Sequence, residues 1–205
     1  YIFENRERYM KCTNAPYFAG GHFDTTNGRI FIYKDTPKLY ETLFHEGIHQ
    51  LVHNVTQMKE KNDKARRNIN MFWFTEGIAC FFEFFKRDTV GGFVLGEVSK
   101  DYVGSVQALM KSNKHTPLQK MMKITYMEFA RNSGNPQYVS AMYAQSWSVV
   151  YFFYTYQNGK YVEKFNDYFK REVDMKGGYD PAKEIFGDLE QLNKEYEEYV
   201  KSLRV

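Results

Sequence analysis

Apolar side chains recur at helical spacing between Pro37 and His53, and this pattern constrains the fold of the 205-residue chain more than any other. The apolar positions are Tyr40, Leu43, Phe44, Ile48, Leu51 and Val52. Intervals of three and four residues place such side chains on one face of an α-helix. A capping residue, Thr36, and a proline at the first helical position come directly before them. The pattern therefore predicts a helix from Pro37 to His53 with one buried face.

Two β-prone runs precede this helix, between Tyr17 and Tyr33, around a turn that contains Asn27 and Gly28. This order is typical of a β-hairpin. Residues 56–70 carry many charges with little apolar periodicity, so we expect a solvated loop or a frayed helix end there. Further helices are expected over residues 71–86, 105–112, 117–122, 136–156, 160–173 and 188–203. The sequence thus predicts an α+β fold with a small N-terminal β-sheet and a mostly helical C-terminal lobe.

Composition excludes several classes of protein. Apolar residues make up 43% and aromatic residues 18%, which is typical of a folded chain, and the length fits one domain over residues 1–205. The 28 basic and 25 acidic residues give a net charge of +3 and are spread along the chain, so we expect no nucleic-acid partner. The longest apolar stretch, Ser146 to Tyr156, is far shorter than the roughly 18 to 20 residues of a membrane-spanning helix. We therefore expect no membrane-spanning segment.

The N-terminus and the two cysteines carry smaller predictions. The chain begins at Tyr1 without methionine, so residues 1–16 are interpreted as the remnant of a preceding segment. Cys12 and Cys80 are too few for a disulfide framework and lack the spacing of a redox or zinc-thiolate site. We expect both to be buried free thiols.

The first predicted helix contains His45-Glu46-Gly47-Ile48-His49, the pattern HExxH. Side chains four residues apart share a helical face, so both imidazoles can reach one cation, and Glu46 lies close enough to hold a metal-bound water. This is the geometry of a zinc hydrolase. The alternative is a pair of hydrogen-bonded histidines on an ordinary helix.

A catalytic zinc takes three protein ligands and keeps the fourth position for water, so a third ligand has to come from elsewhere. Glu76 is a candidate because it lies near the start of the next predicted helix in otherwise apolar company. An unpaired buried carboxylate is costly, and a bond to Zn²⁺ would explain its position. The alternative is a surface glutamate that caps the helix.

The HExxH pattern followed by Glu76-Gly77-x-Ala79 resembles the gluzincin metallopeptidases, in which HExxH on one helix and a glutamate on a second helix bind zinc. The resemblance implies that His45, His49 and Glu76 bind Zn²⁺. It also implies that Glu46 is the general base of peptide hydrolysis.

A closer likeness is to uncharacterised bacterial proteins of the peptidase-MA-like type. They share a Trp-x-x-Glu-Gly-x-Ala segment, here Trp73 to Ala79, and a later Tyr-x-Gln-Ser-Trp segment, here Tyr143 to Trp147. The resemblance extends from Phe18 to the C-terminus. It implies a single zincin-like domain with a rim strand on the sheet and an HExxH active-site helix.

Two further residues acquire candidate roles. Gluzincins place a tyrosine or histidine from the helical lobe near the oxyanion, and the Tyr-x-Gln-Ser-Trp match selects Tyr143, with Tyr138 as the nearest substitute. Glu83 follows Glu76 by seven residues, which is two helical turns, and could accept a hydrogen bond from a zinc-bound histidine. The alternatives are a core aromatic residue for Tyr143 and a surface or ion-paired glutamate for Glu83.

The resemblance also implies a role for the hairpin. Phe18 to Phe23 matches the rim strand that pairs with extended substrate in gluzincins, so Gly20, Gly21 and His22 are predicted to bind a peptide or protein substrate. Gluzincin aminopeptidases carry a Gly-x-Met-Glu-Asn segment at this position, whereas this chain has Gly-Gly-His-Phe-Asp at residues 20–24. Aminopeptidase specificity is therefore not expected.

These observations together predict a zinc-dependent peptidase. The competing hypothesis is a non-catalytic zincin-fold domain that serves as a binding or structural part of a larger protein. The family resemblance favours a secreted or cell-envelope location.

Overall fold

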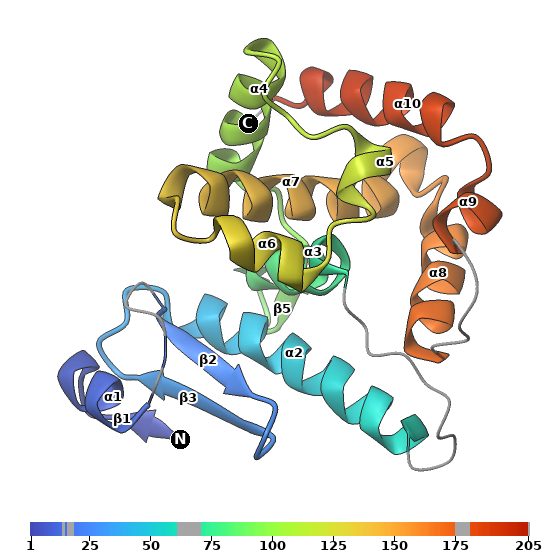
Figure 1. The fold of residues 1–205 in the computed structure, drawn as a ribbon. Helices are drawn as coiled ribbons and strands as arrows, with labels where there is room; N and C mark the ends of the chain where they lie inside the picture. Colours follow the sequence, from blue (N-terminus) through green and yellow to red (C-terminus); the bar gives the residue numbers. More distant parts are fainter. Residues whose placement is uncertain (14, 16–18, 61–70, 175–180, 205) are drawn as a thin grey trace.

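The computed structural model describes residues 1–13, 15, 19–60, 71–174 and 181–204 (Figure 1). The fold is mixed α+β and mostly helical, as predicted, with a small sheet near the N-terminus. In Figure 1 the sheet and α2 form the lower part of the molecule, and the other long helices form a lobe above them. The lower part comprises β1 (Ile2–Phe3), α1 (Arg6–Cys12), β2 (Gly21–Asp24), β3 (Arg29–Tyr33) and α2 (Leu39–Glu60).

The three-stranded sheet has the order β1-β3-β2. Strands β2 and β3 form the predicted antiparallel hairpin, with Gly21 opposite Ile32 and Asp24 opposite Arg29. Gly28 has a φ of +67° in the turn, a conformation that glycine adopts without a steric penalty. Tyr17 and Phe18, the first residues of the predicted hairpin and rim strand, lie outside the described residues. Strand β2 is an edge strand whose outer side pairs with no other described strand.

The described part of the N-terminal segment, which we interpreted as a remnant, packs onto this sheet. Strand β1 runs parallel to β3 and pairs Ile2 with Ile32. Tyr9 on α1 is fully buried, and its ring lies 5.2 Å from that of Tyr33. The segment therefore completes one edge of the sheet. Cys12, predicted to be buried, is instead exposed because it ends α1 at the surface, whereas Cys80 is buried as predicted.

Helix α2 confirms the helix predicted from the apolar periodicity, with different bounds. It begins at Leu39 because the chain first turns at Thr36, whose N–H donates to the carbonyl of Tyr33 at the end of β3. It continues to Glu60, so the first part of the charged segment is helical. The remainder of that segment, residues 61–70, lies outside the described residues.

The upper lobe contains most of the predicted helices and several unpredicted elements. Its elements are α3 (Phe72–Glu83), β4 (Phe85–Arg87), β5 (Phe93–Leu95), α4 (Lys100–Lys111), α5 (Leu118–Met121), α6 (Tyr126–Asn132), α7 (Pro136–Thr155), the 3₁₀ turn Tyr156–Asn158, α8 (Val162–Asp174), α9 (Pro181–Phe186) and α10 (Leu189–Ser202). The sequence did not predict α6, α9 or the β4–β5 hairpin. Helix α3 ends before the predicted position because Phe84 has an extended backbone, and its carbonyl accepts hydrogen bonds from the N–H groups of Gly96 and Glu97.

The core of the lobe forms where α3 packs against α7. Trp73 on α3 and Trp147 on α7 are both fully buried. Gly77 permits the close approach of the two helices, because a Cβ atom at this position would lie 2.5 Å from the carbonyl oxygen of Ser146. Helix α3 is thus held between α7 on one side and α2 on the other. No described helix is long and apolar enough to cross a membrane.

Candidate metal centre

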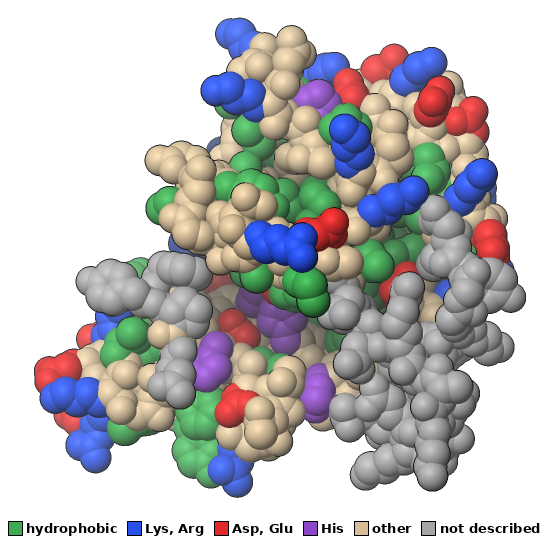
Figure 2. Space-filling view, viewed as in Figure 1, with side chains coloured by type: hydrophobic (Ala, Val, Ile, Leu, Met, Phe, Trp, Pro, Cys, Tyr) green, Lys and Arg blue, Asp and Glu red, His purple; other side chains and the backbone are tan. Residues whose placement is uncertain are grey.

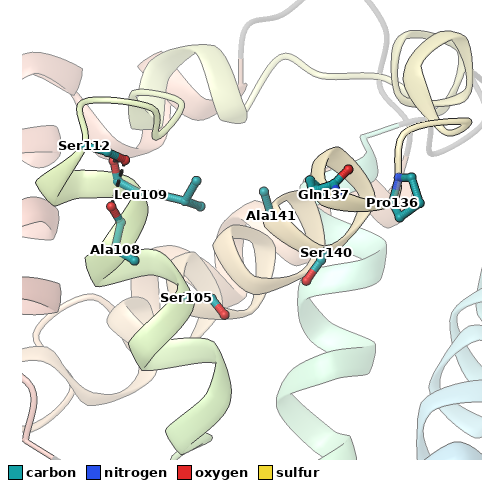
Figure 3. A pocket seen from close by; sticks show the side chains of 8 residues that line it. All are labelled: Ser105, Ala108, Leu109, Ser112, Pro136, Gln137, Ser140 and Ala141. Atoms are coloured by element: carbon teal, nitrogen blue, oxygen red, sulfur yellow. Dashed lines mark hydrogen bonds between the residues drawn. The ribbon is translucent and has the colours of Figure 1, made fainter.

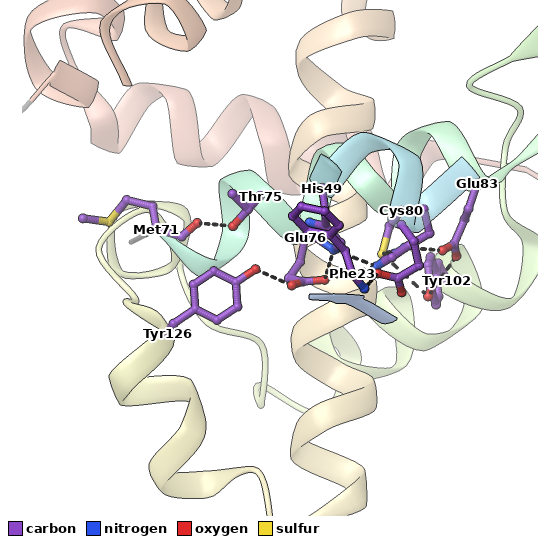
Figure 4. A network of polar contacts seen from close by, with 11 residues as sticks. Phe23, His49, Met71, Thr75, Glu76, Cys80, Glu83, Tyr102 and Tyr126 are labelled. Atoms are coloured by element: carbon purple, nitrogen blue, oxygen red, sulfur yellow. Dashed lines mark hydrogen bonds and ion pairs between the residues drawn. The ribbon is translucent and has the colours of Figure 1, made fainter. Parts of the chain in front are cut away.

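Helices α2 and α3 bring His45, His49 and Glu76 together. Figure 4 shows His49 and Glu76 side by side. The Nε2 atoms of the two histidines are 3.1 Å apart. Glu76 Oε2 lies 3.3 Å from Nε2 of His45 and 3.4 Å from Nε2 of His49. Three potential ligand atoms therefore form a nearly equilateral triangle.

This triangle fits a tetrahedral zinc ion. Zn²⁺ binds nitrogen and oxygen at about 2.0 to 2.1 Å, so tetrahedral coordination requires ligand atoms roughly 3.3 to 3.4 Å apart. Glu76 Oε2 is also buried and receives no hydrogen bond from any described group. Leaving an anionic oxygen without a partner is costly, and a cation in front of the triangle would supply one.

The charges of the buried groups also favour a cation at this position. Burial alone would raise the pKa of Glu76, but the adjacent imidazoles of His49 and His45 hold this pKa well below its ordinary value. Burial likewise lowers the pKa of His45, but the neighbouring Cys80, Glu76 and Glu83 outweigh this effect and raise the pKa well above its ordinary value. The cluster therefore pairs an ionised carboxylate with an imidazole that readily holds a proton, and a metal cation could take the place of that proton.

Glu83 fixes the orientation of His45. Its Oε2 lies 2.8 Å from Nδ1 of His45, and its Oε1 accepts a hydrogen bond of 3.3 Å from the hydroxyl of Tyr102. A carboxylate only accepts hydrogen bonds, so Nδ1 carries the proton, and the lone pair of a neutral imidazole is then on Nε2, which faces the triangle. The structure thus brings Glu83 into contact with a histidine of the HExxH pattern, which is the contact that the sequence analysis considered for this glutamate.

A second group of potential ligands consists of His45, Cys80 and Glu83. Burial, together with the nearby Glu83 charge, raises the pKa of Cys80 to about 12, so a metal ion that bound this sulfur would have to displace its proton. In addition, Nδ1 of His45 already binds Glu83. The donor set of the first triangle is therefore the better fit to a metal ion.

Glu46 lies beside the triangle and is buried. Its Oε2 accepts a 2.7 Å hydrogen bond from the backbone N–H of Phe23 on the edge strand β2. Glu46, which the sequence analysis interpreted as the general base, therefore connects the HExxH helix to the outer edge of β2.

A cavity of about 360 Å³ opens next to these residues. Its lining residues are Ala19, Gly20, Gly21, Lys38, Glu41, Thr42, His45, Glu46, Glu83, Phe84, Tyr102, Val139, Ser140 and Tyr143. Figure 2 shows the hollow between the sheet side and the helical lobe, with histidine side chains gathered along it. The predicted substrate residues Gly20 and Gly21 thus share a cavity with the HExxH helix.

His22, the third predicted substrate residue, points away from this cavity. Successive side chains of a strand alternate between its faces, and the next residue, Phe23, packs edge-to-face on His53 of α2. The His22 side chain therefore lies on the opposite face, where Nδ1 is 2.8 Å from the hydroxyl of Tyr9 and the ring stacks on Phe31. The structure therefore does not bring the His22 side chain to the cavity that Gly20 and Gly21 line.

Tyr143 lines the cavity, as expected of a residue that contacts substrate. Its ring centroid lies 6.4 Å from that of His45. Burial and the charge of Glu76 raise its pKa well above the ordinary value, so the hydroxyl remains a hydrogen-bond donor. Tyr138, the substitute candidate, does not line the cavity, and its ring stacks on Phe129 instead.

Sequence reasoning missed Tyr126 on α6. Its hydroxyl donates a short hydrogen bond to Oε1 of Glu76 (Figure 4). The only local signal is the capping pair of Thr125 and Glu128, which marks a helix start but says nothing about a metal ligand 50 residues earlier.

A second, more open cavity of about 450 Å³ lies between α4 and α7 (Figure 3). Its lining residues are Ser105, Ala108, Leu109, Ser112, Pro136, Gln137, Ser140 and Ala141. No side chain in this lining is acidic, basic, histidine or cysteine. Of these two cavities, the first is the one lined by histidine and acidic side chains.

Comparison with known proteins gives one match. A family model described as "Protein of unknown function (DUF1570)" matches residues 40–173, a range that includes the triangle, Glu46, Glu83 and Tyr143. No curated protein and no solved structure matches the chain.

Proposed function

The chain belongs to the DUF1570 family, and we propose that it is a zinc-dependent peptidase of the gluzincin type with a zincin-like fold. The observation that carries the proposal is the triangle of His45, His49 and Glu76, whose spacing suits tetrahedral Zn²⁺ and whose Glu76 Oε2 lacks a hydrogen bond. Three protein ligands leave a fourth position for water, which distinguishes a catalytic site from a structural one.

In this proposal, His45, His49 and Glu76 would hold the zinc ion, which would supply Lewis-acid chemistry to a water molecule and to the scissile carbonyl group. Glu46 takes the proton of the water and returns it to the leaving amine. Its Oε2 is held by the Phe23 N–H, which leaves Oε1 to accept the proton. Tyr143 donates a hydrogen bond to the oxyanion that forms when the carbonyl is attacked.

The edge strand supports a peptide as the substrate. The N–H of Phe23 points away from β3, and backbone groups alternate sides along a strand, so Gly21 presents its backbone to the same outer side. An extended peptide can add to such an edge through main-chain hydrogen bonds. The peptide would then lie across the cavity that contains Glu46 and Tyr143.

The proposal is tested by two measurements on the same proteins. Bound metal is quantified in the parent and in His49→Ala, and cleavage of a peptide library is followed for the parent and for Glu46→Gln. We expect zinc in the parent and in Glu46→Gln, little zinc in His49→Ala, and a rate in Glu46→Gln that is lower by about a hundredfold to ten-thousandfold. The glutamine can still bind water but cannot take its proton.

Two results would contradict the proposal. Equal zinc content in His49→Ala and the parent would show that His49 is not a zinc ligand. Cleavage by Glu46→Gln at the parental rate would remove the general base. A parent that binds zinc but cleaves no peptide would instead favour the non-catalytic zincin-fold domain.

A further inference from the structure

The contacts of the two Glu76 oxygens differ. Oε2 faces both imidazoles, whereas Oε1 accepts the hydrogen bond from Tyr126. We propose that Tyr126 is a positioning residue that restricts Glu76 to one-oxygen coordination of zinc and so keeps a coordination position open for water. This inference rests on the metal site of the proposed function.

Coordination chemistry gives the reason. A carboxylate can bind a cation through one oxygen or through both, and a second bond from Glu76 would occupy a position that a catalytic zinc needs for water. A hydrogen bond to Oε1 competes with that second bond. The hydroxyl of Tyr126 donates to Oε1 in this structure, so this oxygen already has a partner.

Tyr126 is held in place relative to the helix that carries Glu76. Thr125 caps the start of α6 through a reciprocal pair of hydrogen bonds with Glu128. Thr125 also forms a β-bridge with Met71, and the N–H of Phe72 donates to the carbonyl of Ile124. These contacts fasten the start of α6 to the start of α3.

The ring of Tyr126 completes this arrangement. It packs edge-to-face on Phe72, with ring centroids 5.4 Å apart. Unlike Tyr143, Tyr126 does not line the cavity, so its hydroxyl acts on Glu76 rather than on a substrate. The two tyrosines near Glu76 therefore have separable roles.

The experiment measures zinc binding by the full chain and does not depend on activity. Competition with a chelator of known affinity gives the zinc dissociation constant of the parent, of Tyr126→Phe and of the matched control Tyr138→Phe. Loss of a group that orients a metal ligand typically weakens metal binding by about 10-fold to 100-fold. We expect that loss in Tyr126→Phe, and parental affinity in Tyr138→Phe, whose hydroxyl does not contact Glu76.

A spectroscopic measurement separates coordination from general destabilisation. Cobalt(II) replaces zinc in the same three proteins, and its visible absorption is stronger with four ligands than with five. We expect weaker absorption in Tyr126→Phe, because Glu76 can then bind through both oxygens, and the parental spectrum in Tyr138→Phe.

Unchanged zinc affinity and an unchanged cobalt spectrum in Tyr126→Phe would overturn the inference and leave the proposed peptidase intact. A parent that binds no zinc would overturn both. If Tyr126→Phe does not fold, Thr125→Ala replaces it, since this change removes the helix cap but no atom that contacts Glu76. Weaker zinc binding than the parent then supports the inference, and parental affinity overturns it.

Discussion

At the residue scale, the contacts of the site converge on His45. Its Nε2 faces His49 and Glu76, while its Nδ1 faces Glu83, with the sulfur of Cys80 at 4.0 Å. The imidazole of His45 thus links the triangle of candidate ligands to a chain of hydrogen bonds through Glu83 to Tyr102. Such support orients a metal ligand and raises its basicity.

Tyr143 carries a prediction at the same scale. Tyr143→Phe should lower the catalytic rate by roughly a hundredfold to a thousandfold, because loss of one oxyanion donor costs on the order of 3 to 4 kcal/mol. Zinc content and KM should change little, since the hydroxyl acts on charge that develops only in the transition state. Steady-state kinetics on a peptide cleaved by the parent measure the effect.

Tyr138→Phe is the matched control for this prediction, because Tyr138 lies on the same helix but outside the cavity. It should keep the parental rate. The prediction is contradicted if Tyr143→Phe keeps the parental rate, loses zinc or unfolds at a lower temperature. The hydroxyl would then have a structural role instead.

At the element scale, α3 links the candidate metal centre to the core. Glu76 points to the histidines of α2, and the next residue, Gly77, lies against α7. A small residue is required there because the α7 backbone at Ser146 is so close. Glu76 thus supplies a candidate metal ligand, and the adjacent Gly77 makes the contact with α7 that sets the position of α3.

Gly77→Ala should therefore destabilise the fold. The added Cβ would lie 2.5 Å from the Ser146 carbonyl oxygen and 2.8 Å from Cγ2 of Val150, so the helices must move apart. Overpacking of this kind typically costs about 1 to 3 kcal/mol. Chemical denaturation measures the change in the free energy of unfolding, and weaker zinc binding should accompany it because Glu76 moves with α3.

Gly104→Ala is the control at this scale. Gly104 lies within α4, and a Cβ atom there meets no other atom within 4 Å. Alanine favours a helix interior by up to about 1 kcal/mol over glycine, so this variant should be slightly more stable than the parent. Equal stability of Gly77→Ala and Gly104→Ala would contradict the close-packing argument.

At the scale of the whole molecule, the ligand triangle joins two parts of the fold. His45 and His49 come from α2, which packs on the sheet, and Glu76 comes from α3, which packs in the helical lobe. A metal ion at this position would therefore link the two parts. Because the unfolded chain does not hold the three ligands together, the binding free energy adds to stability.

Zinc should accordingly raise the thermal unfolding temperature. At a free zinc concentration about 1,000 times the dissociation constant, the stabilisation is about 4 kcal/mol. For a chain of this size that corresponds to roughly 8 to 16 °C. Thermal scans with zinc and with a chelator measure the shift, which should be absent in His49→Ala. A parent with the same unfolding temperature in both conditions would contradict the prediction.

Local patterns predicted the parts of this protein that depend on nearby residues. The helical period located most of α2 and all of α7 and α10, and the turn at Gly28 located the β2–β3 hairpin. The HExxH spacing placed His45 and His49 on one helical face, and the seven-residue interval from Glu76 to Glu83 placed two carboxylates on one face of the next helix. Each of these relations is a property of a single helix or turn.

The tertiary structure decided what depends on how the elements meet. The close pairing of α2 with α3 brings Glu76 to the histidines, and the attachment of α6 to the start of α3 brings Tyr126 to Glu76. Strand register turned His22 toward Tyr9, since a shift of one residue reverses the face of every side chain in a strand. Local spacing in the sequence thus identified which groups share a helix and an approximate set of candidate ligands. Which oxygen of Glu76 faces the histidines, and which groups hold it there, depends on contacts between distant segments, which no local spacing encodes.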